Sequence, residues 1–209
     1  MISHGNLYVV AAPSGTGKTT LVKALVESTS TIIVSISHTT RPKRSNEMHG
    51  IHYYFIDVTT FEKMVSQHEF LEHAIIFGHH YGTSKSMVEE TLAKGIDVIL
   101  EIDWQGHQQI KQLFRDAIGI FILPPSMTDL RERLIKRNQD DPKIIQKRLA
   151  DVKEAISHIN EFNYVVINDD FTTALHDLKT ITEAERLRLP QQAKKFSHLI
   201  ASLLDIKIV

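Results

Sequence analysis

Five short apolar runs rich in β-branched residues recur along the chain, and none of them alternates cleanly between apolar and polar positions. They occupy residues 7–11, 31–36, 96–102, 118–123 and 164–167. Continuous apolar runs of this length are typical of strands that are covered on both faces of a sheet. Between several of these runs, apolar residues recur at helical spacing. Alternating strands and helices predict an α/β fold, with a parallel sheet that carries helices on both faces.

Two segments interrupt this regular alternation. Residues 37–84 contain short, partly alternating stretches around a helical stretch at residues 61–67, which predicts a small inserted α+β subdomain. Residues 126–158 are typical of two helices that meet near Pro142, because proline cannot sit deep inside a helix. We interpret this second segment as a second insertion into the core.

The remaining segments form the core of a single predicted domain. The domain spans residues 1–209, and its core is assigned to residues 1–36, 85–125 and 159–209. Within the last of these segments, residues 189–205 predict one further amphipathic helix. The predicted architecture is a parallel-sheet core with one insertion after the second strand and one after the fourth.

The composition excludes several classes of protein. The chain of 209 residues has a formal net charge of −1, so it has no overall basic field to hold a nucleic acid or a membrane surface. The lack of cysteine excludes a disulfide framework and a thiolate metal site. No apolar run approaches the roughly 20 residues of a membrane span, and the N-terminus lacks the features of a secretory signal. These observations predict a cytoplasmic protein, and they leave a homo-oligomer open.

The stretch LYVVAAPSGTGKTT, residues 7–20, leads from the first strand through small residues into a predicted helix. This context is typical of a phosphate-binding loop, G-x-x-x-x-G-K-[ST], with Ala12 at the first glycine position, where alanine costs little if its φ is negative. Backbone N–H groups would converge on the phosphate oxygens, an exposed Lys18 would neutralise the β- and γ-phosphates, and Thr19 would hold Mg²⁺. The residues expected to bind ATP in this loop are Ala12, Pro13, Ser14, Gly15, Thr16, Gly17, Lys18 and Thr19.

A basic cluster after the second strand indicates a second phosphate site. Arg41, Lys43 and Arg44 lie within four residues, and they suit a monoester phosphate held by charge-assisted hydrogen bonds. Tyr53 and Tyr81 can donate hydrogen bonds to the same phosphate. Taken alone, the cluster would be better explained as a solvated basic loop.

A carboxylate in the same predicted subdomain indicates what the phosphate is attached to. Glu72 can accept hydrogen bonds from the N–H groups on one edge of guanine, and adenine has no such paired donors on that edge. The combination of a basic cluster and this carboxylate therefore favours a guanine nucleotide as the second ligand.

Seven ordered motifs give the chain a resemblance to the guanylate kinase family of phosphate-loop kinases. They are APSGTGKTT, SxxxTTRPKR, GxxYxF, FLEHAxxFGxxYGTS, VILEIDWQG, RxQD and NDDF, and they extend from Val9 to about Leu175. The resemblance implies an enzyme of purine nucleotide metabolism that transfers the γ-phosphoryl group of ATP to GMP, and also to dGMP. It further implies that Mg²⁺ is bound together with ATP.

The resemblance also implies roles for individual residues. The GMP phosphate would be held by Arg41, Arg44, Tyr53 and Tyr81, and the guanine base would be read by Ser37, Glu72, Thr83 and Asp103. The resemblance implies that residues 126–158 form a helical lid, in which Arg137 and Arg148 would close over the triphosphate. The other basic lid residues, Arg133 among them, are expected on solvated helix faces. Asn168 matches the position that contacts the adenine side of ATP. The catalytic set implied is Lys18, Arg41, Arg137 and Arg148.

Two acidic residues end the third predicted strand, on the side of the phosphate loop. One of them is expected to organise Mg²⁺ through water beside Thr19, and we assign this role to Glu101, which also belongs to the predicted GMP site. The sequence does not decide between Glu101 and Asp103. The alternative is that both acids cap the following helix.

Other interpretations remain open at this stage. A catalytically silent guanylate-kinase-like module would bind phosphorylated peptides, but such modules typically lose the lysine or the loop spacing, which this chain keeps. A related phosphate-loop kinase of another phosphate ester is disfavoured by Glu72, Thr83 and Asp103. Zinc binding is disfavoured because cysteine partners and a helical H-x-x-x-H pair are both missing around His49, His52, His79 and His80.

Overall fold

The computed structural model describes residues 4–76, 78–136 and 151–204, and the core of this part is a five-stranded parallel sheet. Its strands are β1 (Leu7–Ala11), β2 (Ile32–Val34), β7 (Asp97–Leu100), β8 (Ile118–Leu123) and β9 (Tyr164–Ile167). They lie in the order β2-β7-β1-β8-β9, and every neighbouring pair is parallel. The predicted parallel sheet is therefore confirmed. The second and third predicted strands are each longer than the strands β2 and β7 that form.

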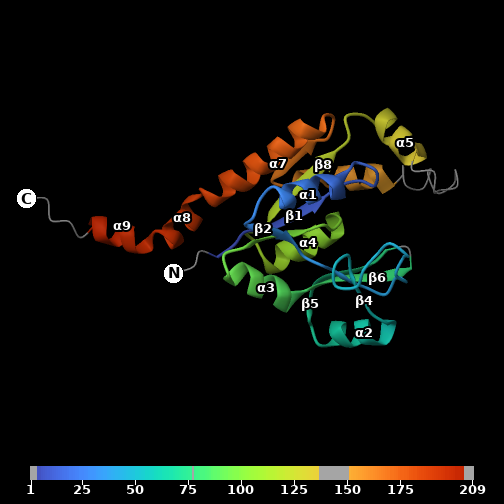
Figure 1. Cartoon of the computed structure of the whole chain (residues 1–209), viewed down its shortest axis with the longest axis horizontal. Coiled ribbons are helices and arrows are strands. Elements are labelled where there is room, and N and C mark those ends of the chain that lie inside the picture. The colour runs from blue at the N-terminus through green and yellow to red at the C-terminus, as the bar shows by residue number, and fades with distance from the viewer. Residues whose placement is uncertain (1–3, 77, 137–150, 205–209) are drawn as a thin grey trace, which may run out of the picture.

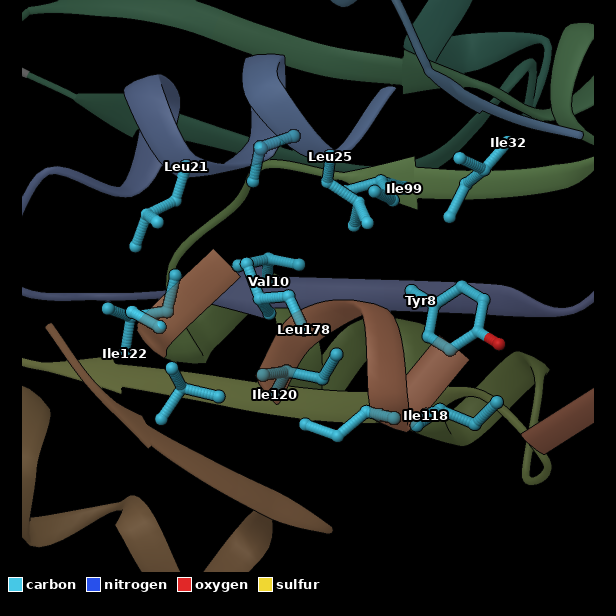
Figure 2. Packing of buried hydrophobic residues seen from close by; sticks show 14 residues of the cluster. Tyr8, Val10, Leu21, Leu25, Ile32, Ile99, Ile118, Ile120, Ile122 and Leu178 are labelled. Carbon is cyan, nitrogen blue, oxygen red and sulfur yellow. The ribbon is translucent and has the colours of Figure 1, made fainter. Parts of the chain in front are cut away.

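Helices cover both faces of this sheet, as predicted (Figure 1). The helices α1 (Lys18–Glu27) and α7 (Phe171–Arg186) pack on one face, and α3 (Lys85–Ala93) and α4 (Trp104–Leu113) pack on the other. The central strand β1 buries Tyr8 and Val10 against the first helix pair, whereas Leu7 and Val9 lie in the cluster of the second pair. Figure 2 shows the first of these clusters, in which side chains of α1 and α7 meet those of all five strands of the sheet. Burial on both faces explains why the strand sequence does not alternate.

The insertion after β2 folds as a second, smaller sheet with one helix. Its strands are β3 (His38–Thr39), β4 (Tyr54–Phe55), β5 (Phe70–Ile76) and β6 (His79–Ser84), in the order β4-β3-β6-β5. The helix α2 (Val58–Ser66) begins where the Asp57 side chain accepts a hydrogen bond from the Thr60 backbone N–H, three residues before the predicted helical stretch. Phe61 of α2 is fully buried and stacks on Phe70 of β5. The predicted α+β character of the insertion is confirmed.

The helical segment after β8 begins with α5 (Met127–Lys136), and its described part resumes at residues 151–157, which are helical and lead into the short 3-10 helix η1 (Ile159–Glu161). Leu130 and Leu134 of α5 form a small core with Val152. The predicted junction near Pro142 lies outside the described residues. In Figure 1, α5 and the insertion lie on opposite sides of the end of the sheet where β1 runs into α1.

The C-terminal segment differs from its prediction. Instead of one helix it forms α8 (Leu189–Lys195) and α9 (Ser197–Leu204), with a break at Phe196. Neither helix buries a residue, so no packed face favours a continuous helix. Both extend away from the body of the molecule (Figure 1). Within residues 4–76, 78–136 and 151–204, no helix has the length and apolar character needed to cross a bilayer.

A buried histidine lies between α4 and the sheet. His107 is 1% exposed, and its ring stacks on Phe162 with the ring centroids 4.1 Å apart. A Cβ atom at Gly119 of β8 would lie 2.5 Å from Nε2 of His107, so only glycine leaves room for the ring. Neither ring nitrogen has a hydrogen-bond partner in the described part of the chain. Burial therefore disfavours the charged form and lowers the pKa of His107 to about 4.

We expect His107 to make the folded state sensitive to acid. Because its pKa is lower in the folded state than the ordinary value near 6.5, its contribution is complete above about pH 6.5 and is lost as the pH falls towards 4. The loss should reach about 3 kcal/mol of unfolding free energy. Urea unfolding from pH 7 to pH 4 measures it, with His107→Leu removing this part of the pH dependence. His176→Gln, at an exposed position of α7, is the control and should keep the parent's pH dependence.

Candidate active site at the carboxyl end of the parallel sheet

A cavity of about 950 Å³ lies where the phosphate-loop segment, the end of β7 and the insertion meet. Ligands of open α/β sheets bind outside the carboxyl ends of the strands, which is the position of this cavity. Most of the predicted site residues line it: Ala12, Pro13, Ser14, Gly15, Thr16, Gly17, Lys18, Thr19, Ser37, Arg41, Arg44, Tyr53, Glu72, Tyr81, Glu101 and Asp103. Arg137 and Arg148 lie outside the described residues.

The loop between β1 and α1 depends on two glycines in the left-handed region. Gly15 has a φ of 90° and Gly17 a φ of 88°, values that residues with a side chain rarely adopt. A Cβ atom at Gly17 would also lie 2.6 Å from Nδ2 of Asn168. His68 is the only non-glycine residue with positive φ in the described part, so Ala12 does not have the conformation that would require glycine. This agrees with the expectation for Ala12.

The side chain of Asn168 supports the loop between β1 and α1. It is 7% exposed, and its side-chain Nδ2 donates a 2.6 Å hydrogen bond to the backbone oxygen of Thr16. Arg133 of α5 donates from Nη2 to the Asn168 backbone oxygen at 3.1 Å. The expectation of a solvated helix face is therefore wrong for Arg133, because its guanidinium joins α5 to the end of β9. The contact of Asn168 with adenine remains a prediction.

The part of the cavity next to the phosphate-loop segment brings a lysine and two oxygen-bearing side chains together. Lys18 is the first residue of α1 and is half-buried, so the expectation of an exposed loop lysine is wrong. Its Nζ donates to the backbone oxygen of Ile102 at 3.4 Å, and burial lowers its pKa, although Glu101 and Asp103 oppose this shift. Thr19 Oγ1 donates to Glu101 Oε2 at 2.9 Å. Two oxygen ligands of the kind that Mg²⁺ prefers thus lie side by side.

Asp103 has a different environment from Glu101. It is the N-cap of α4, and its Oδ1 accepts a 2.9 Å hydrogen bond from the backbone N–H of Gly106. The alternative of a helix cap is therefore correct for Asp103, whereas Glu101 faces the phosphate-loop helix through Thr19. This difference favours Glu101 over Asp103 as the residue near the metal, and the assignment itself remains a prediction.

A group of basic and aromatic residues lines the cavity on the side of the insertion. The guanidinium of Arg41 lies 5.5 Å from the centre of the Tyr53 ring, and the Tyr53 and Tyr81 rings are 5.9 Å apart. Arg41 Nη2 donates to Glu47 Oε1 at 2.6 Å, and the backbone N–H of Arg44 donates to Glu47 Oε2 at 2.9 Å. The ion pair with Arg41 lowers the pKa of Glu47. The carboxylate therefore ties both arginines into one loop.

Glu47 is a site residue that the sequence reasoning missed. It lines the same cavity as Arg41 and Arg44, and its side chain is 12% exposed. The signal that could have identified it is an acidic residue three positions after Arg44, which can close a short turn on that arginine.

The insertion also contributes a buried carboxylate to the lining of the cavity. Glu72 of β5 is 5% exposed and lies opposite Thr83 of β6, whose Oγ1 donates to Glu72 Oε1 at 2.6 Å. Burial raises the pKa of Glu72 to about 7, the Thr83 hydrogen bond partly opposes this shift, and Asp103 adds to it. The Thr83 hydroxyl is thus engaged with the carboxylate. Direct contact of Thr83 with a base remains a prediction.

Two of the histidines considered as zinc ligands, His49 and His52, accept hydrogen bonds from the backbone of the insertion. His49 Nδ1 accepts a hydrogen bond from the Phe55 backbone N–H, and His52 Nδ1 accepts one from Met48. In the residues that the structure describes, no group of three or more histidine, aspartate or glutamate side chains is arranged to hold a metal ion. A cation at Thr19 and Glu101 would therefore need further oxygen ligands from a phosphate or from water.

Comparison with known proteins connects this geometry to a family. The family model described as guanylate kinase matches residues 4–185. The chain is 53% identical over 204 residues to the guanylate kinase of Coxiella burnetii, with 98% of this chain and 99% of that protein covered. It is 49% identical over 205 residues to the guanylate kinase of Escherichia coli strain K12, with 97% and 99% covered.

A solved structure gives the same result at the level of the fold. The crystal structure of guanylate kinase from Anaplasma phagocytophilum superposes with a TM-score of 0.81 at 32% sequence identity, and the alignment covers 99% of this chain and 98% of that one. The family model, the relatives and this structure all extend across the phosphate loop, the insertion and β9. The chain belongs to the guanylate kinase family.

Proposed function

We propose that this chain transfers the γ-phosphoryl group of ATP to GMP, and also to dGMP, giving ADP and GDP. The observation that carries the proposal is the single cavity of about 950 Å³ with two unlike walls. One wall is a phosphate loop at the start of α1, and the other combines arginines and tyrosines with the buried carboxylate of Glu72. A donor and an acceptor nucleotide can therefore meet without a phosphoenzyme intermediate.

On the donor side, ATP binds along the loop from Ala12 to Thr19. Backbone N–H groups and Lys18 hold the β- and γ-phosphates, and Arg137 and Arg148 of the lid complete the positive surroundings. Thr19 and, through water, Glu101 would hold Mg²⁺, and the 2.9 Å contact between their oxygens supports this pair. When bound with ATP, Mg²⁺ supplies positive charge to the phosphate oxygens as negative charge develops.

On the acceptor side, the GMP phosphate binds Arg41, Arg44, Tyr53 and Tyr81. The guanine N1–H and N2–H₂ groups donate to the carboxylates of Glu72 and Asp103, with Ser37 and Thr83 completing the base site. A phosphate oxygen of GMP then attacks the γ-phosphorus in line. No side chain acts as a nucleophile, so the residues work by positioning and by charge stabilisation.

Two competing functions make different demands on the same cavity. A silent module would need only the arginine and tyrosine wall, and it would have no use for Lys18 and the Thr19 and Glu101 pair at the start of α1. A kinase of another phosphate ester would have no use for a buried carboxylate opposite Thr83. Release of ADP in the presence of ATP with GMP, AMP, UMP or no acceptor discriminates all three functions.

We expect Lys18→Ala to remove most of the transfer activity. The lysine supplies charge that is needed most in the transition state, so kcat should fall by about 10²-fold to 10³-fold. Circular dichroism and urea unfolding check that the fold is kept, because Lys18 is half-buried. Lys94→Ala, at an exposed position after α3, is the matched control and should keep the parent's kcat. Equal activities of the two variants would contradict the role of Lys18.

We expect Glu72→Gln to weaken discrimination between GMP and AMP. The amide is nearly isosteric with the carboxylate but presents a donor to the guanine N–H groups, so kcat/KM for GMP should fall by about 10²-fold or more. The KM for ATP should change little, because Glu72 lies in the insertion. Measuring kcat/KM for both acceptors decides the matter. A variant that kept the parent's preference for GMP would show that Glu72 does not read the base.

The same carboxylate should make GMP binding depend on pH. Glu72, with a pKa near 7, faces Asp103 and the hydroxyl of Thr83, and only its ionised form accepts both guanine N–H groups. Affinity for GMP should therefore rise as the pH increases from 6 to 8, by up to about tenfold, when binding is measured by calorimetry. Thr83→Val removes the bond that lowers this pKa, so it should move the rise to higher pH. The Glu72→Gln variant is the control. If the GMP affinity of the parent protein changes no more with pH than that of this variant, the assignment is contradicted.

A further inference from the structure

A stacked ring pair lies next to the acceptor site and has no part in the proposed chemistry. Trp104, the single tryptophan of the chain, is the first residue of α4 and directly follows Asp103. Its ring stacks on His158, with the centroids 3.6 Å apart and the planes 7° from parallel. His158 follows the helical residues 151–157, so the pair joins two segments that are distant in the sequence.

Two further residues hold the imidazole in place. His158 Nδ1 lies 2.6 Å from Glu161 Oε1, and this contact is the main reason why the pKa of Glu161 is lowered. Gln108 Nε2 donates to both carboxylate oxygens of Glu161, at 3.1 and 2.9 Å. Trp104 and Gln108 are four residues apart on α4 and therefore share one face of this helix. Trp104, Gln108, His158 and Glu161 form a connected group of residues, which we name the Trp104 cluster.

The first turn of α4 connects this cluster to the acceptor site. Asp103 caps that turn through the backbone N–H of Gly106. Gly106 in turn lies against the other carboxylate, because a Cβ atom at this position would come within 3.3 Å of Glu72 Oε2. The position of one helical turn thus affects both acidic side chains that would receive the guanine N–H groups.

We propose that His158 is a positioning residue that holds the first turn of α4, and with it Asp103, in the arrangement that accepts guanine. The proposal rests on the proposed function, since it assumes that Asp103 and Glu72 face the base. The side chains of His158 and Glu161 are 24% and 37% exposed, so their contact contributes little to the stability of the whole fold. The nearly parallel stack, in contrast, sets the orientation of Trp104 closely.

The test replaces the imidazole and measures acceptor and donor constants separately. In His158→Ala, the KM for GMP should rise about threefold to tenfold, the size of effect expected for one stacked ring pair. The values of kcat and the KM for ATP should stay within about twofold, since a general loss of structure would change all three. The fluorescence emission of Trp104 should change in the same variant, because its stacking partner is gone. His176→Ala, at an exposed site on α7, is the matched control.

A conservative variant separates the ring from its contact with Glu161. His158→Phe keeps a flat ring for Trp104 and loses the contact with Glu161, so it should recover most of the parent's KM for GMP. If His158→Ala does not fold, Glu161→Ala keeps both rings and frees the imidazole, and it should raise the KM for GMP about twofold to threefold.

Each result has one meaning. An unchanged KM for GMP in His158→Ala, together with changed tryptophan emission, would overturn the proposal while leaving the proposed function intact. Equal losses in the Ala and Phe variants would also overturn it, because the stack would then not be responsible. A parent protein that releases no ADP with GMP would overturn the proposed function, and the positioning role with it.

Discussion

The burial of β1 on both faces is the constraint on which the site depends. Tyr8 and Val10 are held by α1 and α7, and Leu7 and Val9 belong to the opposite cluster, so the strand cannot shift along its axis without exposing apolar side chains. Burying each of these side chains is worth about 1.5–3 kcal/mol. The direction in which β1 ends is therefore fixed, and the glycine-rich loop must open at the carboxyl end of the sheet. The positive φ angles of Gly15 and Gly17 then turn its backbone back into α1.

The wall of the cavity opposite the glycine-rich loop contains a carboxylate, that of Glu72, whose burial is unfavourable. A pKa of about 7 at Glu72 means that the ionised carboxylate is disfavoured by about 3 kcal/mol relative to water, even though Thr83 donates a hydrogen bond to it. A ligand with two N–H donors relieves this cost, whereas a ligand without them leaves the carboxylate unpaired. Glu47 contrasts with Glu72, because its partner Arg41 is already present and lowers its pKa. The two glutamates show that the same side chain can be buried with only a hydroxyl donor, as Glu72 is, or paired with an arginine, as Glu47 is.

The sequence predicts those features that depend on local chemistry. Buried strands follow from apolar runs, and the phosphate loop follows from Gly15, Gly17 and Lys18 between a strand and a helix. Contacts across the fold could not be predicted in the same way. The bond from Asn168 to Thr16 and that from Arg133 to Asn168 join segments that only the packing of β9 and α5 brings together.

The prediction of one continuous C-terminal helix is wrong for a related reason. An amphipathic pattern predicts a continuous helix only if its apolar face is packed against something, and no residue of α8 or α9 is buried. The half-burial of Lys18 has a similar origin, because it results from the return of the chain at Ile102, about eighty residues later in the sequence. Local pattern therefore identifies the chemical groups of this site, and tertiary packing decides which of them are free for a ligand.

The segment directly after β7 unites both halves of the site. Glu101 accepts from Thr19, and the backbone oxygen of Ile102 accepts from Lys18, so the first two residues belong to the donor side. Asp103 raises the pKa of Glu72 on the acceptor side and caps α4, and Trp104 connects this helix to His158. Four consecutive residues thus contact the start of α1 and the segment after the lid, and they influence a carboxylate of the insertion. A reaction that depends on the relative position of two nucleotides needs a short, stiff connection of this kind, because small errors in alignment strongly reduce the rate of transfer.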